Sequence, residues 1–179
     1  MRNFPNFAFK SILMPLKIIA IYAVSENGVI GKDNDLPWDL KSDMRHFMRS
    51  TKGKTVVMGR KSFESIDCKP LPNRRNIIIT RQKDYQAVGA EVANSLEAAI
   101  ELAKEDGEIW ITGGAGVYEE SIKKGFVNLI YETLVHAEVD GDVVFNFPNR
   151  EEWKIVDVDA HQADDKNEFA FTIRTLERK

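Results

Sequence analysis

Asp43 is the residue of this sequence that most directly suggests chemistry, and it follows a turn-rich loop ending in Leu36-Pro37-Trp38. A helix is predicted over Leu40–Thr51, which places Asp43 in its first turn with Met44 and Phe47 beside it at helical spacing. A carboxylic acid set among apolar side chains has a raised pKa and can move a proton. An acid in a first helical turn can equally complement the helix dipole. The spacing alone leaves both interpretations open.

Two glycine-containing segments each lead from an apolar strand into a helix. The first is Met58-Gly59-Arg60-Lys61-Ser62, and the second is Thr112-Gly113-Gly114-Ala115-Gly116-Val117-Tyr118. Unpaired N–H groups at a helix start bind anions, so two such segments suggest a ligand with several phosphates. Neither segment has the spacing of a dinucleotide fingerprint or a Walker A loop. The glycines can also serve only as tight turns.

Two further polar clusters flank the apolar run Asn76–Ile79. Thr80-Arg81-Gln82-Lys83 places a hydroxyl and cations after that strand, although such a cluster is often a solvated loop. In Pro70-Leu71-Pro72-Asn73-Arg74-Arg75, two prolines that stiffen the backbone stand just before two arginines. The planar fork of arginine binds carboxylates in a bidentate manner, so this segment is a candidate carboxylate site.

Alternating strands and helices must position these residues. The expected strands are 17–24, 55–58, 75–80, 90–93, 108–112, 126–135, 152–160 and 168–177, and the expected helices are 40–51, 62–66, 95–104 and 117–124. Near-continuous apolar strands favour a parallel sheet covered on both faces, and the helix-free last third predicts an antiparallel C-terminal hairpin. We therefore expect a single three-layer α/β domain with a central mixed, mostly parallel sheet of about eight strands flanked by about four helices. Ligands of such sheets bind beyond the carboxyl ends of the strands.

Composition excludes several classes of function. The chain has 179 residues, 43% hydrophobic and 30% charged, as expected for one folded domain. With 25 basic and 28 acidic residues, it has no general attraction for nucleic acid or membranes, and we expect neither as a partner. One cysteine and three scattered histidines predict no disulfide framework and no metal site, and they favour a reducing, cytoplasmic location. The longest apolar stretch, residues 18–24, is far shorter than the ~20 residues of a membrane span.

The first 15 residues are expected to be a disordered N-terminal extension, with the folded domain over residues 16–179. Arg2, Lys10 and several apolar residues loosely resemble the start of a signal peptide. Pro15 and Lys17 interrupt the apolar run, and no small-x-small cleavage pattern follows. These features favour the extension over a secretion signal.

Taken in order, these segments resemble the dihydrofolate reductase family, in its chromosomal bacterial type. Each string is common, but their joint order and spacing are specific, and the resemblance runs from about Leu16 to Arg178. The strings that carry it are Gly28-Val29-Ile30-Gly31, Leu36-Pro37-Trp38, Asp43, Val57-Met58-Gly59-Arg60, Phe63-Glu64-Ser65-Ile66, Pro70-Leu71-Pro72 with Arg74, Asn76-Ile77-Ile78, Gly113-Gly114, Val117-Tyr118, Thr133, Glu138 to Asp142, and Phe147-Pro148.

The resemblance implies NADPH-dependent reduction of 7,8-dihydrofolate to 5,6,7,8-tetrahydrofolate, and it implies antifolates as inhibitors. It assigns Asp43 to the pterin and to protonation at N5, with Thr133 orienting the carboxylate. It also implies that Trp38 holds an ordered water, that Leu36 packs near the nicotinamide, and that Arg74 pairs with the glutamate α-carboxylate. The expected walls of the substrate slot are Ile19, Ala20, Met44, Phe47, Ile66 and Leu71.

For the cofactor, the resemblance implies a cis Gly113-Gly114 peptide bond and a set of phosphate-binding groups. Arg60, Thr80 and Arg81 are expected at the 2′-phosphate, and some bacterial relatives have an arginine at the position of Gly116. Because this sequence has no arginine at that position, binding of the 2′-phosphate is expected to depend more on Arg60 and Arg81. The full expected set is Ala20, Ile30, Gly59, Arg60, Lys61, Ser62, Thr80, Arg81, Thr112, Gly113, Gly114, Ala115, Gly116, Val117 and Tyr118.

The resemblance also implies a lid over residues 25–37 that hydrogen-bonds Gly141-Asp142 in one of its states, and a monomeric protein.

Two alternatives to this function remain to be weighed. The pyrimidine-reductase domain of riboflavin synthesis has a similar fold and uses NADPH, but it lacks the pairing of Asp43 and Arg74 with a Leu-Pro-Trp loop. A catalytically silent nucleotide- or pteridine-binding module is disfavoured because Asp43, Thr133 and Trp38 are all present.

Overall fold

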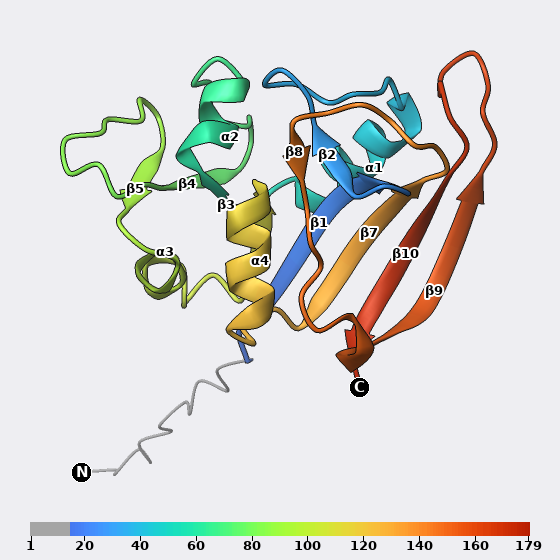
Figure 1. The fold of residues 1–179 in the computed structure, drawn as a ribbon. Coiled ribbons are helices and arrows are strands. Elements are labelled where there is room, and N and C mark those ends of the chain that lie inside the picture. Colours follow the sequence, from blue (N-terminus) through green and yellow to red (C-terminus); the bar gives the residue numbers. More distant parts are fainter. Residues whose placement is uncertain (1–14) are drawn as a thin grey trace, which may run out of the picture.

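Strands and helices alternate along the first two thirds of the chain, and strands dominate the rest (Figure 1). The computed structural model describes residues 15–179, so the expected N-terminal extension lies, apart from Pro15, outside the described residues. The strands are β1 (Lys17–Ser25), β2 (Val29–Gly31), β3 (Thr55–Gly59), β4 (Arg75–Ile79), β5 (Glu91–Ala93), β6 (Glu108–Gly113), β7 (Leu129–Val135), β8 (Val143–Val144), β9 (Trp153–His161) and β10 (Phe171–Arg178). The helices are α1 (Lys41–Thr51), α2 (Arg60–Ser65), α3 (Leu96–Leu102), α4 (Ala115–Lys123) and the 3-10 turn η1 (Arg150–Glu152).

An 8-stranded mixed sheet runs through the molecule in the order β5-β4-β3-β6-β1-β7-β10-β9. The strands from β5 to β7 pair in parallel, whereas β10 is antiparallel to both β7 and β9. Ile19 of β1 lies opposite Trp110 of β6 and Leu129 of β7, which places β1 inside the sheet. The carboxyl ends of β1, β3 and β6 therefore open at one edge. The expected mixed sheet with an antiparallel C-terminal hairpin is confirmed.

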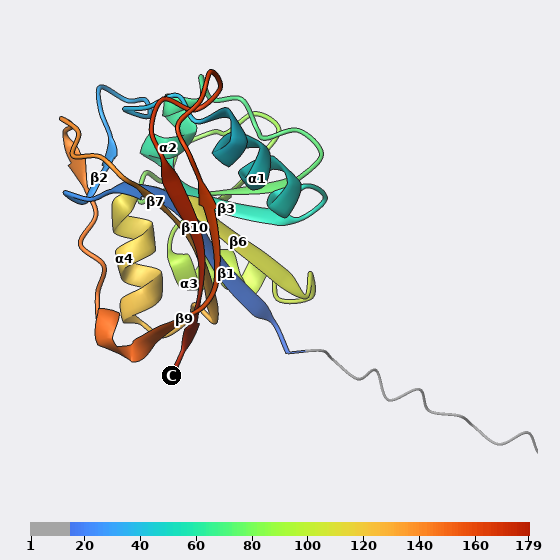
Figure 2. The same cartoon turned by 90° about the vertical axis from the view of Figure 1, so that its right-hand side faces the viewer.

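Alternate residues of the strands face two apolar layers, because side chains of a strand point to opposite faces. Ala20 of β1 belongs to a layer that includes residues of α3 and α4. Its neighbour Ile19 belongs to a second layer with Phe63 of α2 and Phe47 of α1. Figure 2 shows α1 and α4 on opposite sides of the sheet. Coverage of both faces explains why the central strands are apolar throughout.

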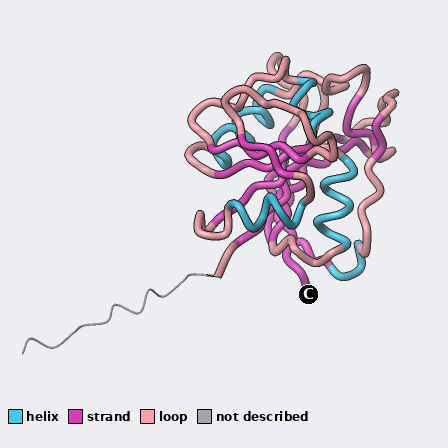
Figure 3. Tube along the Cα trace, turned by 90° about the vertical axis from the view of Figure 1, so that its left-hand side faces the viewer, coloured by secondary structure: helices cyan, strands magenta, loops and turns pink. Residues whose placement is uncertain are grey.

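The structure adds a 2-stranded sheet of β2 and β8 and the 3-10 turn η1, which the sequence did not predict. These strands have 3 and 2 residues, too few to show a periodicity. β7 also begins at Leu129, three positions later than expected, and follows a turn at Gly125 with φ of +75°. Figure 3, with loops in pink, shows much of the connecting chain at the end opposite the marked C-terminus. Within residues 15–179, no helix is long and apolar enough to span a membrane.

Candidate active site

A cleft of about 1170 Å³ lies at the carboxyl ends of β1, β3 and β6. Its walls come from the segment after β1, from α1 and α2, from the loop after β4, and from the start of α4. The expected site residues that line it are Ile30, Leu36, Asp43, Met44, Phe47, Gly59, Arg60, Lys61, Ser62, Ile66, Leu71, Thr80, Arg81, Thr112, Gly113, Gly114, Ala115, Gly116, Val117 and Tyr118. Distant parts of the sequence thus converge where parallel α/β sheets bind their ligands.

Asp43 lines this cleft from the first turn of α1. Thr133 of β7, which is only 2% exposed, donates a 2.6 Å hydrogen bond from Oγ1 to Asp43 Oδ1. Burial raises the pKa of Asp43, and this effect outweighs the opposing influence of the Thr133 hydrogen bond and of two nearby histidines, His46 and His161. The contact with a distant strand favours the proton-transfer interpretation of Asp43 over a role limited to the helix dipole.

The start of α1 is held by a distant turn rather than by its own N-cap residue. Leu40 occupies the N-cap position and makes no side-chain cap hydrogen bond. Instead Asn167, between β9 and β10, accepts the Ser42 backbone N–H at 3.0 Å through its Oδ1 atom. Because the first N–H groups of a helix need acceptors, Asn167 helps to fix where α1 begins and how Asp43 is placed. Sequence reasoning missed this residue, since a partner 125 positions away leaves no local signal.

Leu36 and Trp38, from the loop before α1, have different environments. Leu36 lines the cleft and is 43% exposed, a large exposure for an apolar side chain. Trp38 is buried in a small apolar cluster that includes Leu40 and Phe171. Its Nε1 atom is buried and has no hydrogen-bond partner in the described chain. Trp38 therefore retains a donor that no described residue uses.

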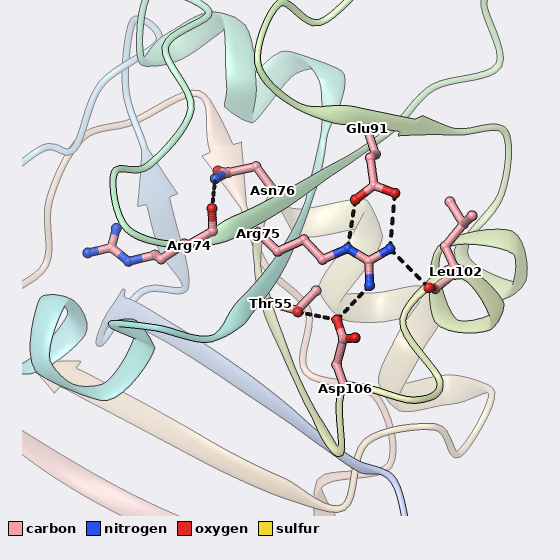
Figure 4. Close-up of polar contacts among 7 residues, drawn as sticks. All are labelled: Thr55, Arg74, Arg75, Asn76, Glu91, Leu102 and Asp106. Atoms are coloured by element: carbon pink, nitrogen blue, oxygen red, sulfur yellow. Dashed lines mark hydrogen bonds and ion pairs between the residues drawn. The ribbon is translucent and has the colours of Figure 1, made fainter.

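Two consecutive arginines at the start of β4 have opposite environments (Figure 4). Arg75 donates to both Glu91 carboxylate oxygens at 2.6 and 3.0 Å, and to Asp106 Oδ2 at 2.7 Å. Arg74 points away from this cluster, and its guanidinium carbon lies 5.8 Å from the centroid of the Phe47 ring. Its buried Nε has no hydrogen-bond partner in the described chain, and burial lowers its pKa. Arg74, rather than Arg75, is therefore suited to an incoming carboxylate.

The two glycine corners, Gly59 before α2 and Gly113-Gly114 before α4, pack against each other and form the glycine wall of the cleft. Gly59 and Gly114 are the N-cap residues of α2 and α4, and neither helix start has a side-chain cap. A Cβ atom would lie 3.2 Å from Val117 Cγ2 if added at Gly59, and 3.0 Å from Ser62 Oγ if added at Gly114. The Gly113–Gly114 peptide bond is cis, as the resemblance implied. A wall without side chains allows a ligand to approach the backbone closely.

The start of α4 supplies the N–H groups of this wall. Ala115 and Gly116 line the cleft in the first turn, where N–H groups have no partner within the helix. Val117 was expected to offer its N–H as well, but that group donates to the Gly114 carbonyl at 2.9 Å. The available donors therefore come from two residues rather than three. Their position suits a phosphate.

The expected cations differ in how far they are already paired. Arg60 Nη1 donates to both carboxylate oxygens of Glu64, at 2.8 and 2.9 Å. Lys61 and Arg81 are exposed and form no ion pair with the described residues, and Thr80 beside Arg81 is 7% exposed. Because Glu64 competes for Arg60, the exposed Arg81 is the stronger candidate for an added phosphate.

The segment after β1 is held against the loop before β8, as expected of the lid. Asp142 donates its backbone N–H to the Gly31 carbonyl at 3.2 Å and accepts the Asp33 N–H through Oδ1 at 3.1 Å. Gly141 is required for this approach, since a Cβ atom there would lie 2.6 Å from the Gly31 carbonyl oxygen. Lys32 Nζ adds an ion pair with Asp140 at 2.9 Å. Residues of this segment form one wall of the cleft.

Two expected residues of β1 do not reach the cleft. Ile19 and Ala20 are buried at 2% and 0% exposure in the two apolar layers, and neither lines the cleft. β1 continues to Ser25, so its carboxyl end lies further along the chain than the expected residues. The residues of β1 that line the cleft are Ile21, Tyr22 and Ala23. Trp38, Arg74 and Thr133 also lie outside the lining, and Thr133 reaches the site through Asp43.

This arrangement defines an α/β enzyme that binds a phosphate-bearing cofactor beside an organic substrate. A family described as dihydrofolate reductase matches residues 17–178. The chain therefore belongs to the dihydrofolate reductase family and is an NADPH-dependent oxidoreductase, as the sequence predicted. Within residues 15–179, no group of three or more histidine, cysteine or acidic side chains could hold a metal ion.

Individual relatives are similar over nearly their whole length. The chain is 43% identical to dihydrofolate reductase type 3 of Salmonella typhimurium, over 90% of this chain and 98% of the relative. It is 39% identical to dihydrofolate reductase of Staphylococcus haemolyticus, over 91% and 96% of the two chains. A structure of dihydrofolate reductase from Enterococcus faecalis, complexed with NADP(H) and RAB-propyl, superposes with a TM-score of 0.83 at 37% identity, covering 91% of this chain and 96% of that chain.

Proposed function

We propose that the chain reduces 7,8-dihydrofolate to 5,6,7,8-tetrahydrofolate with the pterin lying between α1 and the glycine wall of the cleft. The observation that carries this proposal is the Asp43–Thr133 hydrogen bond of 2.6 Å, in a cleft that also contains both glycine corners. When bound, NADPH supplies a hydride from nicotinamide C4 to pterin C6. The protein positions the substrate, excludes water and assists protonation at N5.

Asp43 binds the pterin and promotes the proton transfer. Its Oδ1 accepts the Thr133 hydroxyl, which leaves Oδ2 for the pterin 2-amino group and N3. Because burial raises its pKa, a larger fraction of Asp43 is protonated at neutral pH than of an exposed aspartate. The acid promotes protonation of N5 through an ordered water that the unused indole N–H of Trp38 helps to hold.

Apolar side chains and one arginine bind the rest of the substrate. Phe47, Ile66 and Leu71 form the slot for the pterin and p-aminobenzoyl rings, together with the β1 residues that reach the cleft. Arg74 pairs with the α-carboxylate of the glutamate, because its guanidinium lies beside Phe47 and forms no ion pair with any carboxylate in the part of the chain that the structure describes. Leu36 packs next to the nicotinamide.

The glycine wall and the cations beside it hold the cofactor. The N–H groups of Ala115 and Gly116 bind the pyrophosphate at the start of α4. Arg81 with Thr80 binds the 2′-phosphate, and Arg60 contributes after partial release from Glu64. The remaining residues proposed to contact the cofactor are Ile30, Gly59, Lys61, Ser62, Thr112, Gly113, Gly114, Val117 and Tyr118.

The catalytic unit is residues 16–179, acting as a monomer in the cytoplasm, with residues 25–37 as a lid whose opening governs product release. The hydrogen bonds between Asp142 and this segment support the lid, because they can hold it beside the cleft. Size-exclusion chromatography with light scattering tests the oligomeric state. A stable dimer at micromolar concentration would contradict that part of the proposal.

The activity is tested by following the near-ultraviolet absorbance of NADPH with purified full-length protein and dihydrofolate. We expect oxidation of NADPH that depends on dihydrofolate, and much slower oxidation of NADH. A parallel reaction with the aminopyrimidine substrate of riboflavin synthesis separates the proposed function from the related reductase fold. Failure to oxidise NADPH with dihydrofolate, by protein that binds both ligands, would refute the proposed reaction.

A further inference from the structure

His46 lies one helical turn beyond Asp43 on α1, on the side of the helix that faces the sheet. Residues three apart on a helix are neighbours on one face. Asp43 contacts Thr133 of β7, while the ring centroid of His46 lies 5.7 Å from that of Tyr131, two residues earlier on the same strand. Asp43 and His46 are therefore packed side by side between α1 and β7.

The ring of His46 is only partly buried, but its Nε2 atom is fully enclosed and has no hydrogen-bond partner in the described chain. A protonated imidazole carries N–H groups at both nitrogens, so protonation would place an unpaired donor at Nε2. Burial accordingly lowers the pKa of His46, whereas the neighbouring carboxylate of Asp43 opposes that change. The proposed functions of the cleft leave this buried nitrogen without a role.

Other charged groups, on α1 itself and on β9, also face this pair. Arg49 on α1 lowers the pKa of His46, as does His161 of β9, whereas Asp159 of β9 raises it. The sheet register explains why β9 matters, because Thr133 of β7 lies opposite Ile173 of β10, which lies opposite Asp159. His161 Nε2 is 3.0 Å from Asp159 Oδ2, so those two groups partly balance each other.

We propose that His46 is a positioning residue that acts through Asp43 and controls how readily Asp43 holds its proton. A proton on either side chain disfavours a proton on the other, so His46 lowers the pH below which Asp43 is protonated. This inference rests on the proposed function of Asp43, but the coupling itself is a property of the ligand-free protein. The two groups form no hydrogen bond with each other, so their coupling is electrostatic and reciprocal.

The first experiment measures the coupling without any turnover. The chain has three histidines, and NMR of their ring protons follows each titration separately in the wild-type protein and in Asp43→Asn. We expect the midpoint of His46 to fall by about half a pH unit or more in the variant, because it loses a favourable carboxylate. His136, which contacts Thr172 and Glu26, is the internal control and should not shift. An unchanged His46 midpoint would overturn the proposal, whether or not the chain reduces dihydrofolate.

The second experiment asks whether the coupling reaches the reaction. Single-turnover hydride transfer is measured against pH for wild type, His46→Gln and His46→Lys. In the plot of rate against pH, one change of rate reports the protonation of Asp43. His46→Gln, which removes the ionisable ring, should move the midpoint of that change to higher pH, and His46→Lys, which adds a permanent cation, should move it to lower pH. Shifts in the same direction for both variants would indicate a purely structural effect and overturn the proposal. Met48→Leu, on the exposed side of the same helix, is the matched control and should keep the wild-type midpoint.

Discussion

The two ends of the cleft are built in opposite ways. At the proposed substrate end, the polar groups are few, partly buried and incompletely paired. Asp43 accepts a hydrogen bond from Thr133, and the Nε of Arg74 has no partner among residues 15–179. At the proposed cofactor end, backbone N–H groups and exposed cations dominate, and Arg60 already forms an ion pair with Glu64. Single side chains should therefore dominate function at the substrate end, whereas several weaker contacts should share the task at the cofactor end.

The comparison also separates the origins of the two ends. The glycine wall forms from two short segments whose strand, glycine and helix follow one another in the sequence. The substrate end requires Asp43 from α1, Thr133 from β7 and Asn167 from the last hairpin to meet in space. The glycine wall, which is built from local segments, should tolerate changes elsewhere in the fold. The Asp43 site is assembled from distant elements and therefore depends on the whole sheet.

Replacement of Asp43 by Asn is expected to have the largest effect. Hydride transfer at neutral pH should fall by about 10²- to 10⁴-fold, because the side chain can no longer promote protonation of N5. NADPH affinity should stay close to that of wild type, since the glycine wall is untouched. Stopped-flow fluorescence measures both quantities, and the rate should recover partly at low pH. An unchanged rate at pH 7 would remove the distinction between the two ends.

The second prediction uses the two arginines as a matched pair. Arg74→Leu should weaken folate binding by about 2–4 kcal/mol, roughly 30- to 1,000-fold in Kd, because the glutamate carboxylate loses its partner. Arg75→Leu should leave folate affinity nearly intact but lower the midpoint of urea unfolding, since it breaks the ion pairs with Glu91 and Asp106. Equilibrium fluorescence titration measures binding. A pterin without glutamate should bind both variants as tightly as wild type, and equal losses with that ligand would refute the assignment of Arg74.

The third prediction concerns the cofactor end, where effects should be smaller. Arg81→Ala should reduce the ratio of kcat/KM for NADPH over NADH by roughly 2- to 10-fold, about 0.5–1.5 kcal/mol. Arg60→Ala should reduce it less, because Glu64 already competes for that guanidinium. Steady-state kinetics with both cofactors gives the two ratios. A constant ratio in Arg81→Ala, or a larger loss in Arg60→Ala, would mean that the 2′-phosphate lies elsewhere.

Much of this could be predicted from the sequence because the signals are local. The mixed sheet, its four main helices and the glycine corners follow from apolar runs and turn residues that are contiguous in the chain. The position of Asp43 in α1 also follows from local spacing. The resemblance to a known family then placed Thr133 beside Asp43, which spacing could not have done.

What could not be predicted depends on the length of a strand or on distant partners. Ile19 and Ala20 were placed at the cleft, but an apolar run does not show where a strand leaves the sheet, and Ile21 lies there instead. Asn167 lies in a turn typical of solvent-exposed loops, yet it is 3% exposed and caps α1. The pairing of Arg60 with Glu64 has ordinary helical spacing, but only the structure shows that it forms.

The smallest expected effect, a change of stability with pH, has opposite signs for two aspartates. Burial raises the pKa of Asp43, so its contribution to stability is fully present below the unfolded value of ~3.9 and is lost as the pH rises through its folded value. Asp43→Asn should therefore raise the free energy of unfolding at pH 7. The gain should shrink as the pH falls, because the wild-type carboxyl is then protonated and uncharged.

Asp140, which forms an ion pair with Lys32, supplies the matched control. The hydrogen bond and charge of Lys32 lower its pKa, so its contribution is present above ~3.9 and is lost as the pH falls through its folded value. Asp140→Asn should therefore lower stability slightly at pH 7, and the loss should disappear in acid. Urea unfolding of both variants at several pH values measures the two trends. If Asp43→Asn followed the trend of Asp140→Asn, the fold would stabilise the ionised carboxylate of Asp43. Burial of this carboxylate would then not lower the free energy of unfolding.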